Sequence, residues 1–227
     1  MKVLGLDTSA SVLALGIIAD NQILADVKVK LEGNLSEVLV DVFNQALTDL
    51  NLKVDDLQAL AYSIGPGSFT GLRVGLSFIK GLSFSTGIPI VAVPTLDALA
   101  SQVNLVNTLV VPLIDAKKDL VYSALYTNQN GSLQKISEYL LLPLDKMVEK
   151  IPPDALFILL EDENFRLTWN KLTAEKNVLA KVVTLLPSGV AVAKMGLEKF
   201  RKQQVADPST LEPLYISPVA FKTKKNA

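Results

Sequence analysis

A short pattern that occurs twice, about half a chain apart, limits the folds that this sequence can adopt. An apolar segment ends at Asp7, and the next apolar segment begins five residues later at Val12. The same arrangement recurs 108 positions further on, where one apolar segment ends at Asp115 and the next begins at Leu120. Each copy predicts two strands joined by a tight turn, so the 227 residues are expected to form two related lobes. Because aspartate is common in turns, coincidence is the alternative explanation of the repeat.

Strands and helices alternate around these two copies, and this order predicts an α/β architecture with a mixed sheet. Asn34 followed by Glu37 is typical of a helix N-terminus with a capping box, and Thr95 is the expected cap of a short helix. The other expected strands lie at 23–29, 57–64, 88–93, 120–126 and 155–160, and the other expected helices at 71–85, 143–151 and from Pro187 to about 202.

Composition excludes several kinds of chemistry. The chain has no cysteine and no histidine, so it cannot form a disulfide, a zinc–thiolate site, a cysteine nucleophile or a serine–histidine pair. A net charge of −1 argues against tight binding of nucleic acid by bulk charge. No apolar run approaches the roughly 20 residues of a membrane span. We therefore expect a cytoplasmic protein that does not bind membranes.

A glycine-rich segment, Gly65-Pro66-Gly67-Ser68-Phe69-Thr70-Gly71, joins a predicted strand to a predicted helix. It is not a Walker A loop, because no Gly-Lys-Ser/Thr follows, and it is not a dinucleotide fingerprint or a nucleophile elbow. Backbone amides at such a helix start can bind phosphate. Gly71 and Gly75, four residues apart, can equally serve close helix packing or a partner interface.

Two polar segments also allow two interpretations. Asp7-Thr8-Ser9 can place a carboxylate near a magnesium–phosphate group, or it can be an ordinary polar turn between two strands. Glu161-Asp162-Glu163 can bind a divalent cation, but a solvated charged loop is the simpler interpretation.

Several of these segments resemble the TsaB family, also called YeaZ. The resemblance covers residues 1–126 and about 207–218, and its most specific part is the Gly-Pro-Gly-Ser-Phe-Thr-Gly-Leu-Arg string. The chain departs from the family where Asn34-Leu35-Ser36-Glu37 replaces the usual Arg-x-His-Ser-Glu. The matching segments are residues 6–9, 64–73, 93–99, 114–116, 121–126 and 212–216.

The resemblance implies an actin-like, sugar-kinase-like (ribonuclease H-like) α/β fold of two related lobes with mixed sheets flanked by helices. It implies a non-catalytic scaffold or dimerisation subunit in the synthesis of threonylcarbamoyladenosine beside the tRNA anticodon. In that pathway the paralogue TsaD transfers threonylcarbamoyl to the N6 of adenosine, and the small ATPase TsaE completes the bacterial complex. Since TsaD carries metal-binding histidines, the absence of histidine here favours TsaB.

The same resemblance supplies the expected partners and site. The partners are TsaD, TsaE, tRNA through the complex and a second copy of the chain when TsaD is absent, with ATP or ADP and magnesium at the interface with TsaD. No catalytic residue and no metal ligand are assigned. The expected partner interface is Leu35, Val38, Leu39, Val42, Leu72, Leu76 and Ile79, and the possible phosphate contacts are Asp7, Thr8, Ser9, Gly65, Gly67, Ser68 and Thr70.

The sequence also leaves two other functions to consider, and it predicts where one lobe ends and the other begins. An ATP-dependent small-molecule kinase on the same fold would use Asp7 and Thr8 at the phosphates, whereas a glycoprotein endopeptidase would lack its histidine-based machinery. The expected lobes are 1–105, which carries the partner-binding helices, and the smaller 106–227. The chain after about 207 is expected to return to the first lobe, with 222–227 as a flexible tail.

Overall fold

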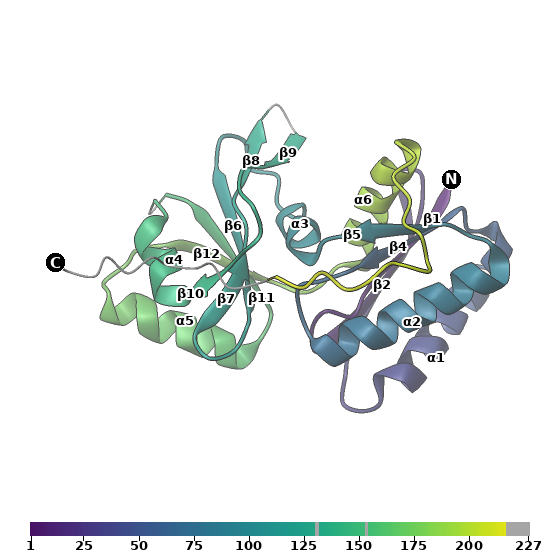
Figure 1. The fold of residues 1–227 in the computed structure, drawn as a ribbon, viewed down its shortest axis with the longest axis horizontal. Helices are drawn as coiled ribbons and strands as arrows, with labels where there is room; N and C mark the ends of the chain where they lie inside the picture. Colours follow the sequence, from purple (N-terminus) through teal and green to yellow (C-terminus); the bar gives the residue numbers. More distant parts are fainter. Residues whose placement is uncertain (130–131, 153, 217–227) are drawn as a thin grey trace.

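The computed structural model describes residues 1–129, 132–152 and 154–216, and these form two lobes that each contain one sheet (Figure 1). The predicted tail at 222–227 lies outside the described residues. The first sheet has the order β3-β2-β1-β4-β5 and the second contains β10-β7-β6-β11-β12. The strands of the first sheet are β1 (Lys2–Asp7), β2 (Val12–Ala19), β3 (Gln22–Lys30), β4 (Ala59–Ser63) and β5 (Ile90–Val93). Those of the second are β6 (Leu109–Asp115), β7 (Leu120–Ser123), β8 (Tyr126–Gln129), β9 (Ser132–Lys135), β10 (Leu140–Pro143), β11 (Leu156–Leu160) and β12 (Lys181–Leu185).

The two sheets repeat one topology, which confirms the two related lobes predicted from the sequence. In the first sheet β1 is antiparallel to β2 and parallel to β4, and in the second β6 is antiparallel to β7 and parallel to β11. The strands that end in Asp7 and Asp115 therefore occupy equivalent positions. The hairpin of β8 and β9, attached through β8 to β6, has no counterpart in the first sheet.

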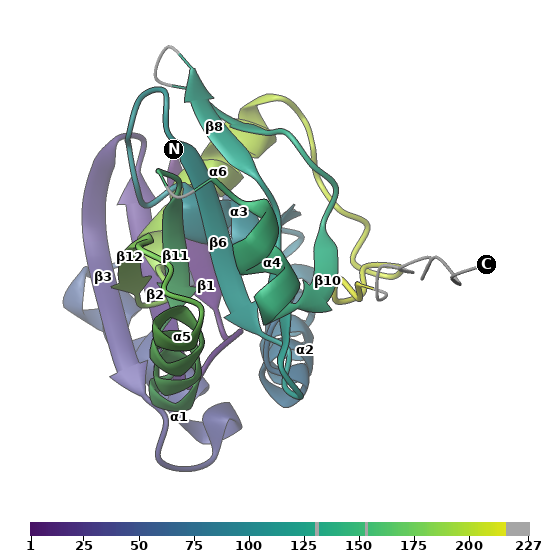
Figure 2. The same ribbon diagram turned by 90° about the vertical axis from the view of Figure 1, so that its left-hand side faces the viewer.

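The helices cover both faces of the first sheet and flank the second. Helices α1 and α2 lie along one face of the first sheet and pack on each other, while α6 covers the opposite face. In Figure 2 the second lobe faces the viewer. Behind it, α1 and α2 lie in the lower part of the view and α6 lies in the upper part. No helix in the described ranges is long and apolar enough to span a bilayer. The helices are α1 (Leu35–Asp49), α2 (Phe69–Thr86), α3 (Thr95–Ala100), α4 (Leu144–Lys150), α5 (Glu163–Glu175) and α6 (Gly189–Arg201), with a 3-10 turn at Val54–Asp56.

The lobes exchange two helices. Helix α3 follows the first sheet in sequence, but Leu96 and Leu99 belong to the apolar core of the second sheet. Helix α6 follows the second sheet, but Val192 and Leu197 belong to a core with the first. The chain therefore returns to the first lobe at α6, earlier than the expected position near residue 207. Beyond α6, Ala206 bridges to β5.

The contact between α6 and the first sheet is too close for side chains. A Cβ atom on Gly189 would lie 2.2 Å from the backbone nitrogen of Gly16, and one on Gly5 would lie 2.1 Å from the Gly189 carbonyl oxygen. A Cβ atom on Gly196 would lie 2.2 Å from the Cβ of Ala61. Glycine at these positions is therefore required for the two backbones to approach.

Local details correct several expectations. Asn34 is the N-cap of α1, as predicted, but its side chain accepts from the Ser36 nitrogen and donates to the Glu37 carboxylate, so the predicted capping box does not form. Thr95 is the first residue of α3 rather than its cap, which is Pro94. The strand expected at 120–126 is broken between β7 and β8. Helix α5 and strands β9, β10 and β12 were not predicted.

The expectation that one apolar stripe on α1 and α2 is free for a partner is wrong for most of its residues. Five of the seven side chains are buried inside this chain, between the helices and the first sheet, and the other two are half-buried. A helix that covers a sheet needs such a stripe for its own core. The buried residues are Leu35, Leu39, Leu72, Leu76 and Ile79, and the half-buried ones are Val38 and Val42.

Two glycines on α2 give a matched stability test. A methyl group at Gly75 would lie 2.4 Å from Thr8 Oγ1 and 2.7 Å from the Tyr62 hydroxyl, whereas one at Gly81 meets nothing within 4 Å. Gly75→Ala is expected to lower the free energy of unfolding by about 1–3 kcal/mol, since overpacking outweighs helix propensity. Gly81→Ala is expected to raise it by about 0.5–1 kcal/mol. Denaturant unfolding of both variants measures these changes, and equal behaviour would contradict the packing described here.

Candidate functional site

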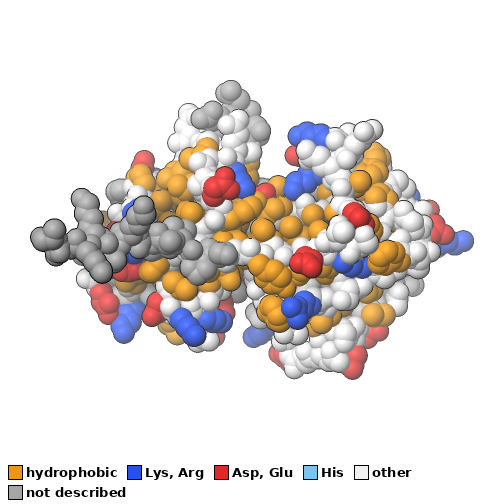
Figure 3. Space-filling view, viewed as in Figure 1, with side chains coloured by type: hydrophobic (Ala, Val, Ile, Leu, Met, Phe, Trp, Pro, Cys, Tyr) orange, Lys and Arg blue, Asp and Glu red, His pale blue; other side chains and the backbone are white. Residues whose placement is uncertain are grey.

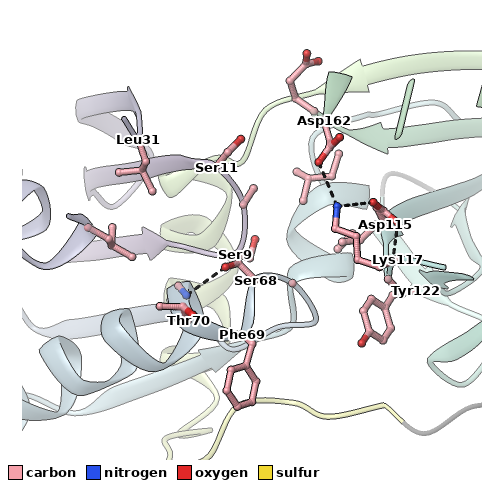
Figure 4. A pocket seen from close by; sticks show the side chains of 18 residues that line it. Ser9, Ser11, Leu31, Ser68, Phe69, Thr70, Asp115, Lys117, Tyr122 and Asp162 are labelled. Carbon is pink, nitrogen blue, oxygen red and sulfur yellow. Dashed lines mark hydrogen bonds and ion pairs between the residues drawn. The ribbon is translucent and has the colours of Figure 1, made fainter. Parts of the chain in front are cut away.

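A cleft of about 550 Å³ lies between the lobes and contains most of the polar residues that the sequence singled out. Four segments supply most of its lining: the turn after β1, the loop that leads into α2, the turn after β6 and the loop between β11 and α5. Leu31, Leu35 and Tyr122 complete it. Figure 4 shows Ser9, Ser68 and Thr70 of the first lobe facing Asp115 and Lys117 of the second. The repeat thus places its two turns on opposite walls of one cleft.

The first-lobe wall is built from the glycine-rich loop and the β1–β2 turn. The Ser68 backbone nitrogen donates to the Ser9 carbonyl oxygen at 2.7 Å, and the Ser68 hydroxyl accepts from the Gly71 nitrogen at 3.2 Å as the N-cap of α2. A Cβ atom on Gly67 would lie 2.4 Å from the Ser9 carbonyl oxygen, so only glycine allows this approach. The buried Ser9 hydroxyl has no hydrogen-bond partner among the described residues.

Thr8 lies beneath this wall and serves packing. Its hydroxyl is 2.8 Å from the Gly71 carbonyl oxygen and 2.9 Å from the Tyr62 hydroxyl. The Tyr62 hydroxyl donates to the Leu72 carbonyl oxygen at 2.7 Å. These buried contacts join β1 and β4 to the first turn of α2, so they fix the position of the loop.

Asp7 is also covered. Its carboxylate accepts from the Ser9 backbone nitrogen at 2.8 Å, and burial raises its pKa above the ordinary value, which this backbone hydrogen bond partly opposes. Of the seven residues considered for phosphate contact, four line the cleft and three do not. Those that line it are Ser9, Gly67, Ser68 and Thr70, and those beneath or beside it are Asp7, Thr8 and Gly65.

The second-lobe wall is acidic, and its one cation is held in an ion pair. Lys117 Nζ lies 2.7 Å from Asp115 Oδ2 and 3.8 Å from Asp162 Oδ2. The hydrogen bond with Asp115 raises the pKa of Lys117. Glu161 also lines this wall. Three consecutive residues of the turn, 117–119, have positive φ angles, a conformation that side chains disfavour.

The acidic segment 161–163 begins a helix. The Asp162 carboxylate accepts from the Phe165 backbone nitrogen at 2.9 Å as the N-cap of α5, and Glu163 lies in the first turn, where negative charge is favourable. Neither interpretation from the sequence anticipated this role. Within the described ranges, no group of three or more acidic side chains is placed to hold a metal ion.

A second candidate surface is a shallow apolar groove of about 410 Å³ between α1 and α2. Val40 is 43% exposed there, and Phe78 packs edge-on against Phe43 with ring centroids 5.2 Å apart. The Arg73 guanidinium lies 3.9 Å from the centroid of the Phe69 ring. In Figure 3, hydrophobic and basic side chains alternate over α2. The groove, which we call the α1–α2 groove, is lined by Ser36, Leu39, Val40, Arg73, Val74, Ser77 and Phe78.

The burial of Asp7 predicts a pH effect on stability. Because its pKa is raised in the folded chain, the folded state holds a proton that the unfolded state loses as pH rises above about 4. The burial of Asp7 therefore makes the folded state progressively less stable as the pH rises from about 4 to the raised pKa that Asp7 has in the folded chain. Asp7→Asn is expected to raise the free energy of unfolding at pH 7 and to flatten this fall. Urea unfolding between pH 4 and pH 8 tests it, and an Asn variant less stable at pH 7 would contradict it.

Comparison with known proteins agrees with this architecture. A family model described as TsaD, tRNA N6-adenosine threonylcarbamoyltransferase, matches residues 30–216. The tRNA threonylcarbamoyladenosine biosynthesis protein TsaB of Bacillus subtilis is 32% identical over 136 residues, which are 60% of this chain and 59% of that protein. TsaB of Escherichia coli is 32% identical over 134 residues, which are 58% of each chain. The matched regions thus span less than two thirds of these two relatives.

Solved structures share the whole fold. YeaZ from Pseudomonas aeruginosa superposes with a TM-score of 0.77 at 20% identity, covering 95% of this chain and 99% of that one. The activator of 2-hydroxyisocaproyl-CoA dehydratase from Clostridium difficile, solved with bound ADPNP, gives a TM-score of 0.53 at 9% identity, covering 95% and 100%. The fold is therefore the actin-like α/β fold of two related lobes. From the extent of the family match and the names of its relatives, the chain belongs to the TsaB (YeaZ) family, within the wider group that the TsaD model describes.

Proposed function

We propose that this chain is a non-catalytic subunit of the machinery that makes threonylcarbamoyladenosine in tRNA, and that it acts by binding TsaD. The observation that carries the proposal is the α1–α2 groove, an exposed apolar surface on two helices that are otherwise fully engaged with the first sheet. The names of the relatives supply the pathway, and the TsaD model that matches this chain supports a paralogous partner.

The shape of the α1–α2 groove suits a helical partner. Ser77 and Gly81 lie one turn apart on α2, and a Cβ atom at Gly81 would meet nothing within 4 Å. Small residues in such a row let a second helix approach closely. Val40 and Phe78 line the groove beside Ser77, and Phe84, about one turn beyond Gly81 on α2, is 67% exposed. A partner helix that packs here buries apolar surface which the isolated chain leaves in water.

The same surface is proposed to join two copies of the chain when TsaD is absent. A single groove cannot hold both partners at once, so TsaD and the second copy compete for it. TsaE and tRNA are proposed to bind to the assembled complex, with the transfer to the N6 of adenosine carried out by TsaD.

The inter-lobe cleft gives little support to the kinase alternative. Asp7, the carboxylate that a kinase would place at a magnesium–phosphate group, does not line the cleft. The opposite wall presents Asp115, Glu161 and Asp162 against one paired lysine, and this balance repels a polyphosphate. The residues that line the cleft in this chain therefore fit ATP poorly. Any ATP or ADP with magnesium is proposed to bind only at the joint interface with TsaD.

Charge and bulk in the α1–α2 groove should weaken TsaD binding. Val40→Asp and Ser77→Arg are each expected to reduce the affinity at least tenfold, because each places a charged group in the buried centre of the interface. Binding of the cognate TsaD is measured by calorimetry and by size exclusion with light scattering. Leu179→Asp, at an apolar residue that is 89% exposed on the second lobe, is the matched control and should bind normally. Full binding by both groove variants would overturn the proposed surface.

The chain alone is expected neither to bind ATP measurably nor to hydrolyse it, because the second-lobe wall is acidic and Asp7 is covered. Calorimetry with ATP and magnesium, together with a phosphate-release assay, tests this expectation. Turnover by the purified chain that is lost in Asp7→Asn would instead establish the kinase alternative.

A further inference from the structure

A second cavity, of about 570 Å³, lies on a different side of the molecule from the cleft and from the α1–α2 groove. Its walls come from the segment that follows α3 (residues 101–104), the β8–β9 hairpin and α6, so both lobes contribute to it. Figure 1 shows α3 at the base of the notch between the hairpin and α6, and Figure 3 shows the surface hollowed there. Its volume is that of a small-molecule site. We call it the rear cavity.

One buried polar group in the rear cavity lacks a partner. Asn128 lines the cavity and is 3% exposed, and its side-chain nitrogen donates to Asn104 Oδ1 at 2.6 Å. Its side-chain oxygen Oδ1 has no hydrogen-bond partner among the described residues. An unpaired buried acceptor costs stability, so this position favours a ligand that supplies a hydrogen-bond donor.

Two opposite charges on α6 also line the rear cavity. Lys194 and Glu198 lie four residues apart, which places them on one side of the helix about 6 Å apart along its axis. Neither side chain forms an ion pair or a hydrogen bond with any residue that the structure describes. The order Lys before Glu is the less favourable one for pairing within a helix, so both charges stay available to a ligand.

The remaining lining is partly apolar. Helix α6 presents Ala191 and Met195 on the same side as the two charges. Val103 comes from the segment that follows α3, and Leu133 comes from the hairpin. This surface can hold an aliphatic or aromatic side chain away from water.

We propose that the rear cavity binds a small zwitterion, a free α-amino acid or a dipeptide with an apolar side chain. Lys194 binds its carboxylate, Glu198 binds its ammonium group, and Asn128 Oδ1 accepts a hydrogen bond from a ligand N–H. The apolar side chain packs against α6. Because the cavity joins α3, the hairpin and α6, an occupied site also restrains the two lobes relative to each other.

The test uses the full chain and a panel of L-leucine, L-methionine, L-phenylalanine and their homodipeptides, with binding followed by calorimetry and NMR shift mapping. At least one probe is expected to bind with a Kd below about 1 mM and to shift resonances of α3, β8 and α6. The N-acetyl and methyl ester derivatives, which lack one charge each, should bind at least tenfold more weakly. Comparison of amino acids with dipeptides identifies which of the two is the ligand.

Variants of exposed residues separate the proposal from general effects on folding. Lys194→Glu and Glu198→Lys are each expected to weaken binding at least tenfold, and the double exchange should restore most of it because both charges return. Lys202→Ala, at the exposed end of α6, is the control and should change nothing. The proposal is overturned if no probe saturates, if the blocked derivatives bind equally well, or if the single reversals have no effect.

Discussion

The close contact between α6 and the strands of the first sheet fixes the arrangement of the whole molecule. Gly189 on α6 meets Gly16 and Gly5 backbone to backbone, although about 170–180 residues separate them in sequence. Because α6 follows the second lobe in the chain, this contact brings the end of that lobe back to the strands at which the chain began. Since α3 crosses in the opposite sense to cover the second sheet, the two lobes are joined at two places. Both the cleft and the rear cavity depend on that double connection.

A second constraint, a set of buried hydrogen bonds, fixes the position of the glycine-rich loop. These bonds explain why the polar residues beneath the loop serve packing. Thr8 and Tyr62 are buried and contact the first turn of α2 through its carbonyl oxygens at Gly71 and Leu72. To reach a phosphate in the cleft, Thr8 would have to give up those contacts. In this chain the polar turn therefore orients α2, and through α2 it orients the α1–α2 groove.

The sequence predicted the fold of the first lobe well, because strong periodicity and clear caps coincide there. Asn34, the glycine-rich loop and the repeat of Asp7 at Asp115 each had a local signal. Helix α5 was missed because acidic residues at its start resembled a loop, although Phe165, Trp169 and Leu172 carry helical spacing. Of the short strands after Tyr126, β9 pairs with its sequence neighbour β8, whereas β10 is defined by its pairing with β7 on the far side of that hairpin, which no local pattern reveals.

Which apolar side chains are buried was harder to predict from the sequence than where the helices lie. Burial decided which of the expected interface residues are exposed to a partner. An apolar stripe looks the same in sequence whether it faces a sheet or a partner, so Leu39 and Ile79 could not be told apart from Val40. In the structure the core takes the aliphatic stripe, and the exposed groove is left with Val40, small residues and aromatic rings. That division is physically consistent, because a surface in contact with water keeps less apolar area than a core, and the small side chains of Ser36 and Ser77 leave room for a close approach to the groove. A helix that packs in the α1–α2 groove, as proposed above, would therefore leave the packing that holds the first lobe together undisturbed.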